Sequence, residues 1–122
     1  MTQKIIAAHG GRESVKAGEL IRVDLDFVLG NDVTSPVAIN EFEKAGFDRI
    51  FSKEKIALVM DHFTPAKDIN SVGLVKRSKE FAAKYGIVNF FDVGKVGVEH
   101  ALLPEQGLVA PGEIIMIGRA HV

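Results

Sequence analysis

Short apolar runs alternate with stretches that carry helical signals along the whole chain, and this alternation constrains the fold more than any single motif. Runs rich in β-branched and aromatic residues are typical of strands that a sheet buries on both faces. The runs that predict strands are 20–23, 27–29, 56–60, 88–91 and 113–117. Repeated strand–helix–strand order is typical of βαβ units with parallel strands. We therefore expect an α/β fold with a mainly parallel sheet and helices on both faces, in a three-layer α/β/α arrangement.

The clearest helix has recognisable start and stop signals. Ser35 is a good N-cap residue, and Pro36 suits the first helical position. Gly46 suits the left-handed residue that follows a helix end. The sequence thus predicts a helix that begins at Ser35 and ends before Gly46.

Three further helical segments are predicted. Residues 68–85 have apolar side chains at helical spacing, and Gly86 ends this helix. A shorter helix is expected over 98–103, and Pro104 is expected to end it because the residue before a proline avoids the helical conformation. Residues 3–8 are expected to form one or two helical turns before a pair of glycines.

Composition indicates the class of protein and excludes several kinds of site. The length of 122 residues suits one domain, so we expect a single α/β domain over 1–122. The net charge of −1 leaves no electrostatic footprint for nucleic acid or for an anionic membrane surface. The chain has neither an apolar run as long as a membrane span nor a signal peptide, so we expect a cytoplasmic protein. Cysteine is absent, which excludes thiolate catalysis and a cysteine-ligated iron–sulfur cluster built from this chain alone.

Polar side chains follow three of the predicted strands, at the ends where those strands meet the next loop. They are, in chain order, Asn31 with Asp32, Asp61 with His62, and His100. In parallel sheets, ligands bind beyond the carboxyl ends of the strands. We therefore expect these side chains to meet at one edge of the sheet and to form the candidate site.

Asp61 and His62 form the strongest candidate pair. A carboxylate beside an imidazole fixes its tautomer, and imidazole titrates closest to neutral pH, so the pair suits general acid–base chemistry. The alternative is that Asp61 caps the following turn while His62 packs or hydrogen-bonds locally. Asn31 with Asp32 equally suits turn and cap chemistry, and His100 alone suits a partly buried structural role. The expected convergence at one sheet edge favours the functional interpretation.

Other functional motifs do not fit the sequence. Gly94 and Lys95 lack the earlier glycine and the following Ser or Thr of a phosphate-binding loop. The histidines, including His121 near the C-terminus, do not show close metal-ligand spacing. We therefore expect no metal site in this chain.

Three stretches, 23–46, 56–71 and 91–118, carry a resemblance to a known family. Within them the motif DHFTP occupies 61–65, and the motif GxxHxLLPExG occupies 97–107. With these motifs in order over almost its whole length, the chain resembles the aconitase superfamily. The resemblance is specifically to the N-terminal part of the large subunit of 3-isopropylmalate dehydratases (isopropylmalate isomerases), with homoaconitases as the close alternative.

The resemblance implies a [4Fe-4S]-dependent hydro-lyase. Such an enzyme removes water from a hydroxy di- or tricarboxylate and returns it with the hydroxyl on the neighbouring carbon. For a 3-isopropylmalate dehydratase, this reaction interconverts 2-isopropylmalate and 3-isopropylmalate in leucine biosynthesis. The resemblance also implies part of aconitase domain 1 as the fold and a separate small subunit as partner. The cluster belongs to the full-length parent, and none is expected in this chain.

Residue roles follow from the resemblance position by position. Asp61 and His62 would protonate or position the departing hydroxyl. His100 would be a second active-site imidazole. Asn31 matches a position of polar substrate contact, and Asp32 lies beside it as a second substrate-binding candidate.

The chain departs from the family pattern after Gly118. The family continues with Gly-x-Asp-Ser-His-Thr, whereas residues 119–122 here read RAHV, and the three cluster cysteines are absent. We therefore expect residues 1–122 to be an incomplete N-terminal portion of a larger large subunit, inactive by itself. Such a portion is expected to expose an apolar surface and an unpaired strand edge, both of which favour self-association.

Two alternatives from other classes are consistent with parts of the sequence. A receiver-like signalling module would use Asp61 as phosphoacceptor, with Asp24 and Asp26 as the acidic pair that such domains need near their first strand. A binding module would hold a dicarboxylate or the small subunit weakly, without catalysis.

Overall fold

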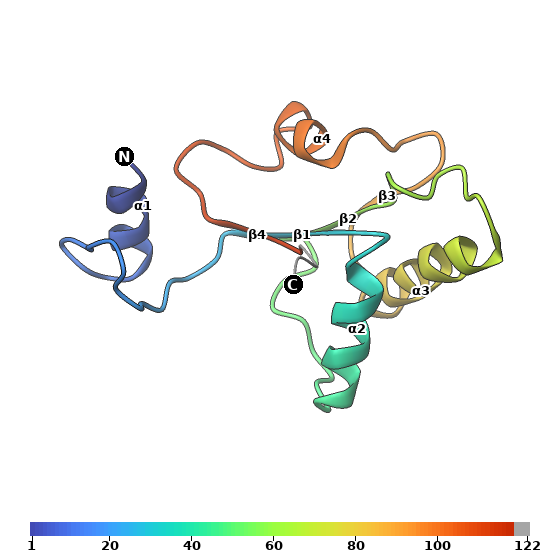
Figure 1. Ribbon diagram of the computed structural model, residues 1–122, viewed down its shortest axis with the longest axis horizontal. Coiled ribbons are helices and arrows are strands. Elements are labelled where there is room, and N and C mark those ends of the chain that lie inside the picture. Colours follow the sequence, from blue (N-terminus) through green and yellow to red (C-terminus); the bar gives the residue numbers. More distant parts are fainter. Residues whose placement is uncertain (119–122) are drawn as a thin grey trace.

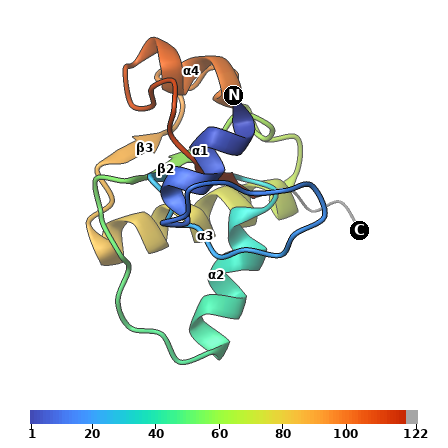
Figure 2. The same ribbon diagram turned by 90° about the vertical axis from the view of Figure 1, so that its left-hand side faces the viewer.

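The computed structural model describes residues 1–118 (Figures 1 and 2), and residues 119–122, which include His121, lie outside the described residues. The elements in chain order are α1 (Thr2–His9), β1 (Phe27–Asn31), α2 (Ser35–Lys44), β2 (Ile56–Val59), α3 (Ile69–Tyr85), β3 (Asn89–Phe91), α4 (Glu99–Glu105) and β4 (Ile115–Ile117). Within the described range, no helix has the length and apolar character needed to cross a membrane.

The strands form a four-stranded parallel sheet with the order β3-β2-β1-β4. β1 pairs with β2 from Val28 opposite Ile56 to Asn31 opposite Val59. Helices α2 and α3 lie on one face of the sheet, and α4 lies on the other (Figure 1). The predicted three-layer α/β/α arrangement is thereby confirmed, and all the strands of this sheet direct their carboxyl ends to the same edge.

Two apolar cores lie on opposite faces of the sheet. They are separated because successive side chains of a strand point to opposite faces. One core packs under α2 and α3, and the other packs under α4. The buried members of the first core are Ile39, Ile56, Leu58, Met60, Phe81, Ala82 and Ile87, and those of the second are Phe27, Leu29, Ala57, Val59, Leu102 and Leu103.

The predicted strand over 20–23 is wrong. This segment lies outside the sheet, and Leu20 is 97% exposed. β1 has no free side for it, because β2 pairs with one edge of β1 and β4 with the other. A backbone hydrogen bond from Asp24 N to His9 O (3.0 Å) ties the end of the segment to α1 instead.

The predicted N-cap of α2 is also wrong. The N-cap residue is Thr34, without a side-chain capping bond, and Ser35 is the first helical residue. Asn31 replaces the expected serine cap, because its Oδ1 accepts hydrogen bonds from Val33 N (3.0 Å) and Thr34 N (2.9 Å). The polar end of β1 therefore starts the helix, and the Ser35 hydroxyl is left without a hydrogen-bond partner among the described residues.

The other predicted helix ends agree with the structure, with one exception. Asp68 caps α3, and Gly86 follows α3 in the left-handed conformation (φ 66°). Gly46 follows α2 with a φ of 74°. Pro104, however, lies inside the last turn of α4 instead of ending it. This proline lacks the N–H that would donate to His100 O, and the helix ends one residue beyond it, where Gln106 N donates to Leu102 O (2.9 Å).

Candidate functional site

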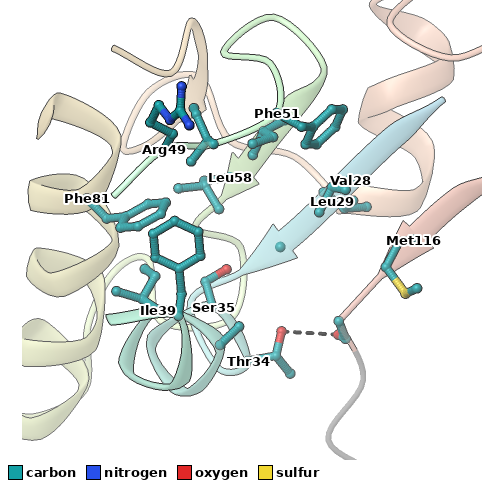
Figure 3. A pocket seen from close by; sticks show the side chains of 16 residues that line it. Val28, Leu29, Thr34, Ser35, Ile39, Arg49, Phe51, Leu58, Phe81 and Met116 are labelled. Carbon is teal, nitrogen blue, oxygen red and sulfur yellow. Dashed lines mark hydrogen bonds between the residues drawn. The ribbon is translucent and has the colours of Figure 1, made fainter. Parts of the chain in front are cut away.

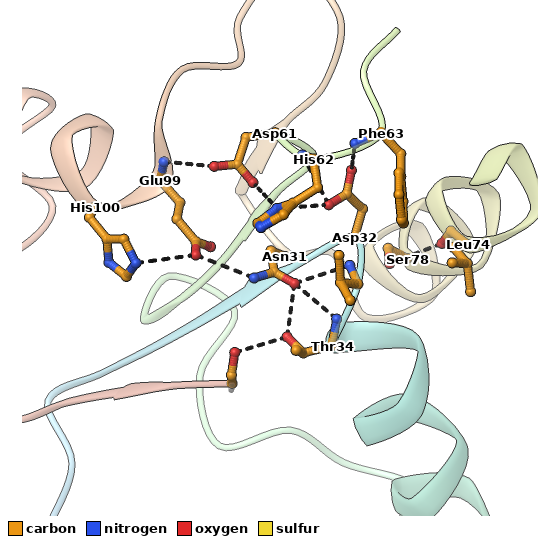
Figure 4. A network of polar contacts seen from close by, with 12 residues as sticks. Asn31, Asp32, Thr34, Asp61, His62, Phe63, Leu74, Ser78, Glu99 and His100 are labelled. Carbon is orange, nitrogen blue, oxygen red and sulfur yellow. Dashed lines mark hydrogen bonds and ion pairs between the residues drawn. The ribbon is translucent and has the colours of Figure 1, made fainter. Parts of the chain in front are cut away.

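Six polar side chains meet at the carboxyl edge of the sheet, and we call them the polar site (Figure 4). They come from the ends of β1 and β2 and from the first turn of α4. The members are Asn31, Asp32, Asp61, His62, Glu99 and His100. The structure thus brings together the five residues singled out from the sequence, and it adds Glu99 to them.

Asn31 connects β1 to both α2 and α4. The residue is only 5% exposed. Besides the two backbone amides at the start of α2, its Oδ1 accepts from Thr34 Oγ1 (2.9 Å). Its Nδ2 donates to Glu99 Oε1 (3.3 Å) at the start of α4. Because both ends of the amide have partners, Asn31 is held in one orientation.

Asp32 supports the neighbouring loop and is closed to solvent. Its side chain is fully buried. One carboxylate oxygen accepts from His62 N (3.2 Å), and the other accepts from Phe63 N (2.7 Å). Hydrogen bonds to both oxygens satisfy a carboxylate that burial would otherwise penalise. Asp32 therefore holds the backbone that carries His62.

Asp61 joins His62 to α4. Its Oδ1 lies 2.7 Å from His62 Nδ1, and its Oδ2 accepts from Glu99 N (2.9 Å). The second bond satisfies one of the free N–H groups at the start of α4. The carboxylate therefore caps this helix, which is distant in sequence, and holds an imidazole at the same time.

His62 presents one ring nitrogen to carboxylates, and the other has no hydrogen-bond partner among residues 1–118. Besides Asp61, Asp32 Oδ1 lies 3.3 Å from His62 Nδ1. The hydrogen bond to the Asp61 carboxylate places a proton on Nδ1, so Nε2 is the nitrogen available to a ligand. The side chain is 45% exposed, which gives such a ligand access.

Glu99 is the functional candidate that the sequence reasoning missed. It is 5% exposed, and its Oε1 lies 3.4 Å from His100 Nε2. His100 itself is half exposed at the rim of the polar site. The sequence signal that could have identified it is a glutamate directly before His100 in a helical run that is otherwise mostly apolar. A glutamate that such a run buries is expected to be paired, because buried glutamates are rare unless they have a partner.

Asp92 lies at the same sheet edge but outside the polar site. Its carboxylate accepts from Val93 N (2.8 Å) and from Lys79 Nζ of α3 (3.1 Å). The Val93 N–H and then the Lys79 ammonium hold the pKa of Asp92 below its ordinary value, although partial burial opposes them. This carboxylate therefore ties β3 to α3.

Three members of the polar site have the spacing of metal ligands. One ligand atom each from Asp32, Asp61 and His62 lies within 4.8 Å of the others. The hydrogen bonds already described account for both oxygens of each aspartate without an ion. This cluster alone gives no reason to assign a metal.

The geometry does not support a receiver-like signalling site. Asp26 precedes β1 and therefore lies at the amino end of the sheet, whereas Asp61 follows β2 at the carboxyl end. The Asp26 carboxylate is bound by His9 Nε2 (2.6 Å) and by Ile114 N (2.7 Å). The acidic pair that this alternative needs, Asp24 and Asp26, thus precedes β1 and does not lie beside Asp61.

A separate apolar groove lies on the α2 face of the sheet, between α2, β1 and β4 (Figure 3). Its volume is about 330 Å³, and none of the six polar-site residues lines it. Met116 of β4 lines the groove and is 52% exposed. Other lining side chains are Val28, Ile39, Phe42 and Leu58. The groove is an exposed apolar surface of the kind expected from the sequence.

Comparison with known proteins shows which proteins the chain is similar to. No protein-family model matches the chain. The chain is 60% identical over 121 residues to the 3-isopropylmalate dehydratase large subunit of Clostridium botulinum (strain Eklund 17B / Type B), a match that covers 99% of this chain and 29% of that protein. The corresponding large subunits of Caldanaerobacter subterraneus subsp. tengcongensis and Thermoanaerobacter pseudethanolicus are 60% and 62% identical, with the same coverage.

These matches confirm the resemblance that the sequence motifs carry. They extend over nearly every residue of the chain, whereas the chain spans only about 29% of the length of these relatives. Over that span, the chain is similar to the N-terminal part of 3-isopropylmalate dehydratase large subunits.

Proposed function

We propose that this chain supplies acid–base and substrate-orienting groups to a hydro-lyase that interconverts 2-isopropylmalate and 3-isopropylmalate. The observation that carries the proposal is the polar site itself, where two imidazoles and a fixed amide meet at the carboxyl edge of a parallel sheet. Ligands of such sheets bind at that edge. The family of the relatives supplies the reaction class.

In this proposal, His62 acts on the hydroxyl that leaves. As imidazolium, it gives the proton on Nε2 to the hydroxyl oxygen while the carbon–oxygen bond breaks, and water departs. A base removes the proton of the neighbouring carbon, and the electron pair of that carbon–hydrogen bond forms the double bond. Asp61 accepts at Nδ1, so the ring keeps its orientation before and after the transfer. A general acid held in this way contributes roughly 10²–10⁴-fold to a rate.

His100 and Asn31 hold the substrate and the released water. His100 is half exposed and lies in the same polar site as His62. Asp32 acts through the backbone of the loop, because its buried carboxylate is already bound by two N–H groups. We therefore assign it a positioning role in place of direct substrate contact.

The iron–sulfur cluster expected for the family does not fit the donor set of this chain. Thiolates are the usual ligands of such clusters, and the chain has no cysteine. A cluster in the whole enzyme would therefore take its ligands from other parts of the protein. The base that removes the carbon-bound substrate proton is assigned in this proposal to a separate small subunit, so the elimination requires that partner.

A chimeric large subunit tests the proposal. The residues of the Clostridium botulinum large subunit that align with this chain are replaced by this chain, and the product is purified with its small subunit. Conversion of 2-isopropylmalate to 3-isopropylmalate is then followed by NMR. We expect turnover from the chimera and a loss of about 10²–10⁴-fold on His62→Asn.

Asp48→Asn is the matched control, because its side chain is 91% exposed and lies outside the polar site. Its turnover should equal that of the unmodified chimera. A chimera that assembles with the small subunit but does not convert isopropylmalate contradicts the proposal. Conversion of a homocitrate-type substrate instead would assign the chain to the homoaconitase alternative.

A further inference from the structure

Glu99 occupies an unusual position for an acidic side chain. It is 5% exposed at the first position of α4, and it lies between two residues that the proposed function assigns to the substrate. Isolated buried carboxylates are costly, so a buried glutamate is expected to serve neighbouring groups. Only one of its oxygens, Oε1, has partners among the described residues, and the buried Oε2 has none.

The partners of Oε1 come from different elements. Asn31 Nδ2, at the end of β1, donates to it from 3.3 Å, and His100 Nε2, on α4, lies 3.4 Å away. Figure 4 shows the Glu99 carboxylate between these two side chains. One oxygen atom thus accepts a hydrogen bond from an amide and lies within ion-pair distance of an imidazole.

From this geometry we infer that Glu99 is a positioning residue, whose buried carboxylate holds the Asn31 amide and the His100 imidazole as one fixed pair. The inference concerns the same site as the proposed function, but its test does not depend on turnover. With its proton on Nε2 toward Glu99, neutral His100 offers Nδ1 to a ligand. His62 offers Nε2 for the equivalent reason, so the two histidines present opposite ring nitrogens.

The backbone of Glu99 is also held in place by a hydrogen bond. Glu99 N donates to Asp61 Oδ2 (2.9 Å), so the backbone of Glu99 is bound by the same aspartate that holds His62. The histidines are therefore linked through two carboxylates, with Asp61 on one side and Glu99 on the other. A shift of α4 would move both imidazoles together.

NMR on the 15N-labelled 122-residue chain tests the inference. In the unmodified protein near neutral pH, we expect the neutral ring of His100 to carry its proton on Nε2 and the Asn31 side-chain amide to show a downfield proton. On Glu99→Gln, the shape of the side chain is kept and the charge is lost. The Asn31 amide proton should then move upfield, and the His100 ring nitrogen signals should move with it.

Glu105→Gln is the matched control, since Glu105 is exposed at the other end of α4. It should move neither signal. If Glu99 has only a packing role, Glu99→Gln lowers the melting temperature and leaves the Asn31 and His100 signals in place, which overturns the inference. If this variant fails to fold, the NMR spectrum of the unmodified protein still tests the inference. A neutral His100 ring that carries its proton on Nδ1 would overturn the inference.

The readout separates this inference from the proposed function. Coupled movement of the two signals supports Glu99 as a positioning residue even if the chimera does not act on isopropylmalate. Conversely, an active chimera with uncoupled Asn31 and His100 signals supports the proposed function and overturns the role of Glu99.

Discussion

The buried carboxylate of Asp32, directly after β1, accepts a hydrogen bond from the backbone N–H of His62, directly after β2 (3.2 Å). Its other oxygen accepts from the next amide, Phe63 N (2.7 Å). The direction in which the His62 ring points is therefore set by a residue of the neighbouring strand. The two strand ends behave as one unit, although 30 positions separate Asp32 from His62 in the sequence.

Asp32→Asn should destabilise the protein and loosen this loop. An asparagine has only one acceptor oxygen, so its NH₂ group would face a backbone N–H and leave a buried donor unpaired. We expect a loss of about 1–3 kcal/mol in the free energy of unfolding. Urea titration measures this loss, and hydrogen exchange of the Phe63 amide should become faster. The exposed Asp48→Asn should change stability by less than about 0.5 kcal/mol; equal stabilities for the two variants would contradict the assigned role.

Position 30 requires a glycine because the Ser35 hydroxyl occupies the space that a Cβ atom would need. A Cβ at position 30 would lie 2.2 Å from Ser35 Oγ and 3.1 Å from a methyl group of Leu58. We expect Gly30→Ala to cost about 1–3 kcal/mol, because this part of the structure has no room for the extra methyl group. Ser35→Ala alone should be nearly neutral, since the buried hydroxyl lacks a partner among the described residues.

A double-mutant cycle checks this interpretation. Gly30→Ala should cost less in the Ser35→Ala background than in the unmodified protein, because the clashing oxygen is gone. The measurement is the free energy of unfolding of all four proteins in urea. The same cost of Gly30→Ala in both backgrounds would show that Ser35 is not the obstacle.

The sequence allowed the architecture and the meeting of the polar residues to be predicted, for local reasons. Buried parallel strands are short apolar runs, and helix ends such as Asp68 and Gly86 are specified by their own side chain or by glycine. Once the strands are parallel, residues that follow them share one edge. Asp61, His62 and His100 could therefore be placed together without knowing any distance.

The errors arose where distant residues decide the outcome. The start of α2 depends on the Asn31 amide more than on Ser35, which is the better N-cap by residue type. Segment 20–23 has the composition of a strand, but both sides of β1, the strand that follows it in the chain, are already paired. In the sequence, Glu99 does not differ from an ordinary exposed charged residue. Its contacts form only when α4 packs against the ends of β1 and β2. Contacts between residues that are distant in the sequence cannot be predicted from helical spacing or composition.

The attachment of α1 should depend on pH. His9 Nδ1 donates to Ile5 O (2.8 Å), and Nε2 donates to Asp26 Oδ2 (2.6 Å). The Ile5 carbonyl and then the Asp26 carboxylate raise the pKa of His9 above 6.5, although partial burial opposes them. The Ile114 N–H and then His9 lower the pKa of Asp26, again against some burial.

The sign of the effect follows from these directions. A raised histidine pKa gives stability that is present below pH 6.5 and is lost as pH rises through the pKa of folded His9. A lowered aspartate pKa gives stability that is lost only as pH falls through the pKa of folded Asp26. The pair therefore contributes most in mildly acidic solution. Hydrogen exchange of the α1 amides should become faster between about pH 6 and pH 8 relative to the intrinsic rate. His9→Gln should remove that change, and an unaltered profile in the variant would exclude His9 as its cause.

Asp68 should contribute to stability as the cap of α3. Its Oδ1 accepts from Ser71 N and from Ser71 Oγ, both at 2.8 Å. The Ser71 amide and then the Ser71 hydroxyl lower the pKa of Asp68. We expect Asp68→Ala to cost about 1 kcal/mol and Asp68→Asn clearly less, since asparagine keeps the acceptor. Thermal unfolding compares the two, and equal melting temperatures would argue against capping as the cause.

In the described part of the chain, β4 pairs on one side only, and its open side should make the chain self-associate. Gly118 N donates to Leu29 O (3.1 Å), and Phe27 N donates to Ile114 O (3.4 Å), so the amide groups of Ile115 and Ile117 point away from β1. A strand edge of this kind can pair with a second copy, and β4 carries no charged residue or proline that would oppose pairing. The apolar groove adjoins the same strand.

Met116→Lys tests this expectation at the residue shared by the edge strand and the groove. Because Met116 is 52% exposed, a lysine can reach solvent and should cost the monomer less than about 0.5 kcal/mol. A charge there opposes the burial that association requires, so the average mass in sedimentation equilibrium should fall toward 13.2 kDa. Leu20→Lys, at a 97% exposed position outside the groove, should leave association unchanged. An unmodified chain that stays monomeric at every concentration, or equal masses for both variants, would show that this face does not bind a second copy.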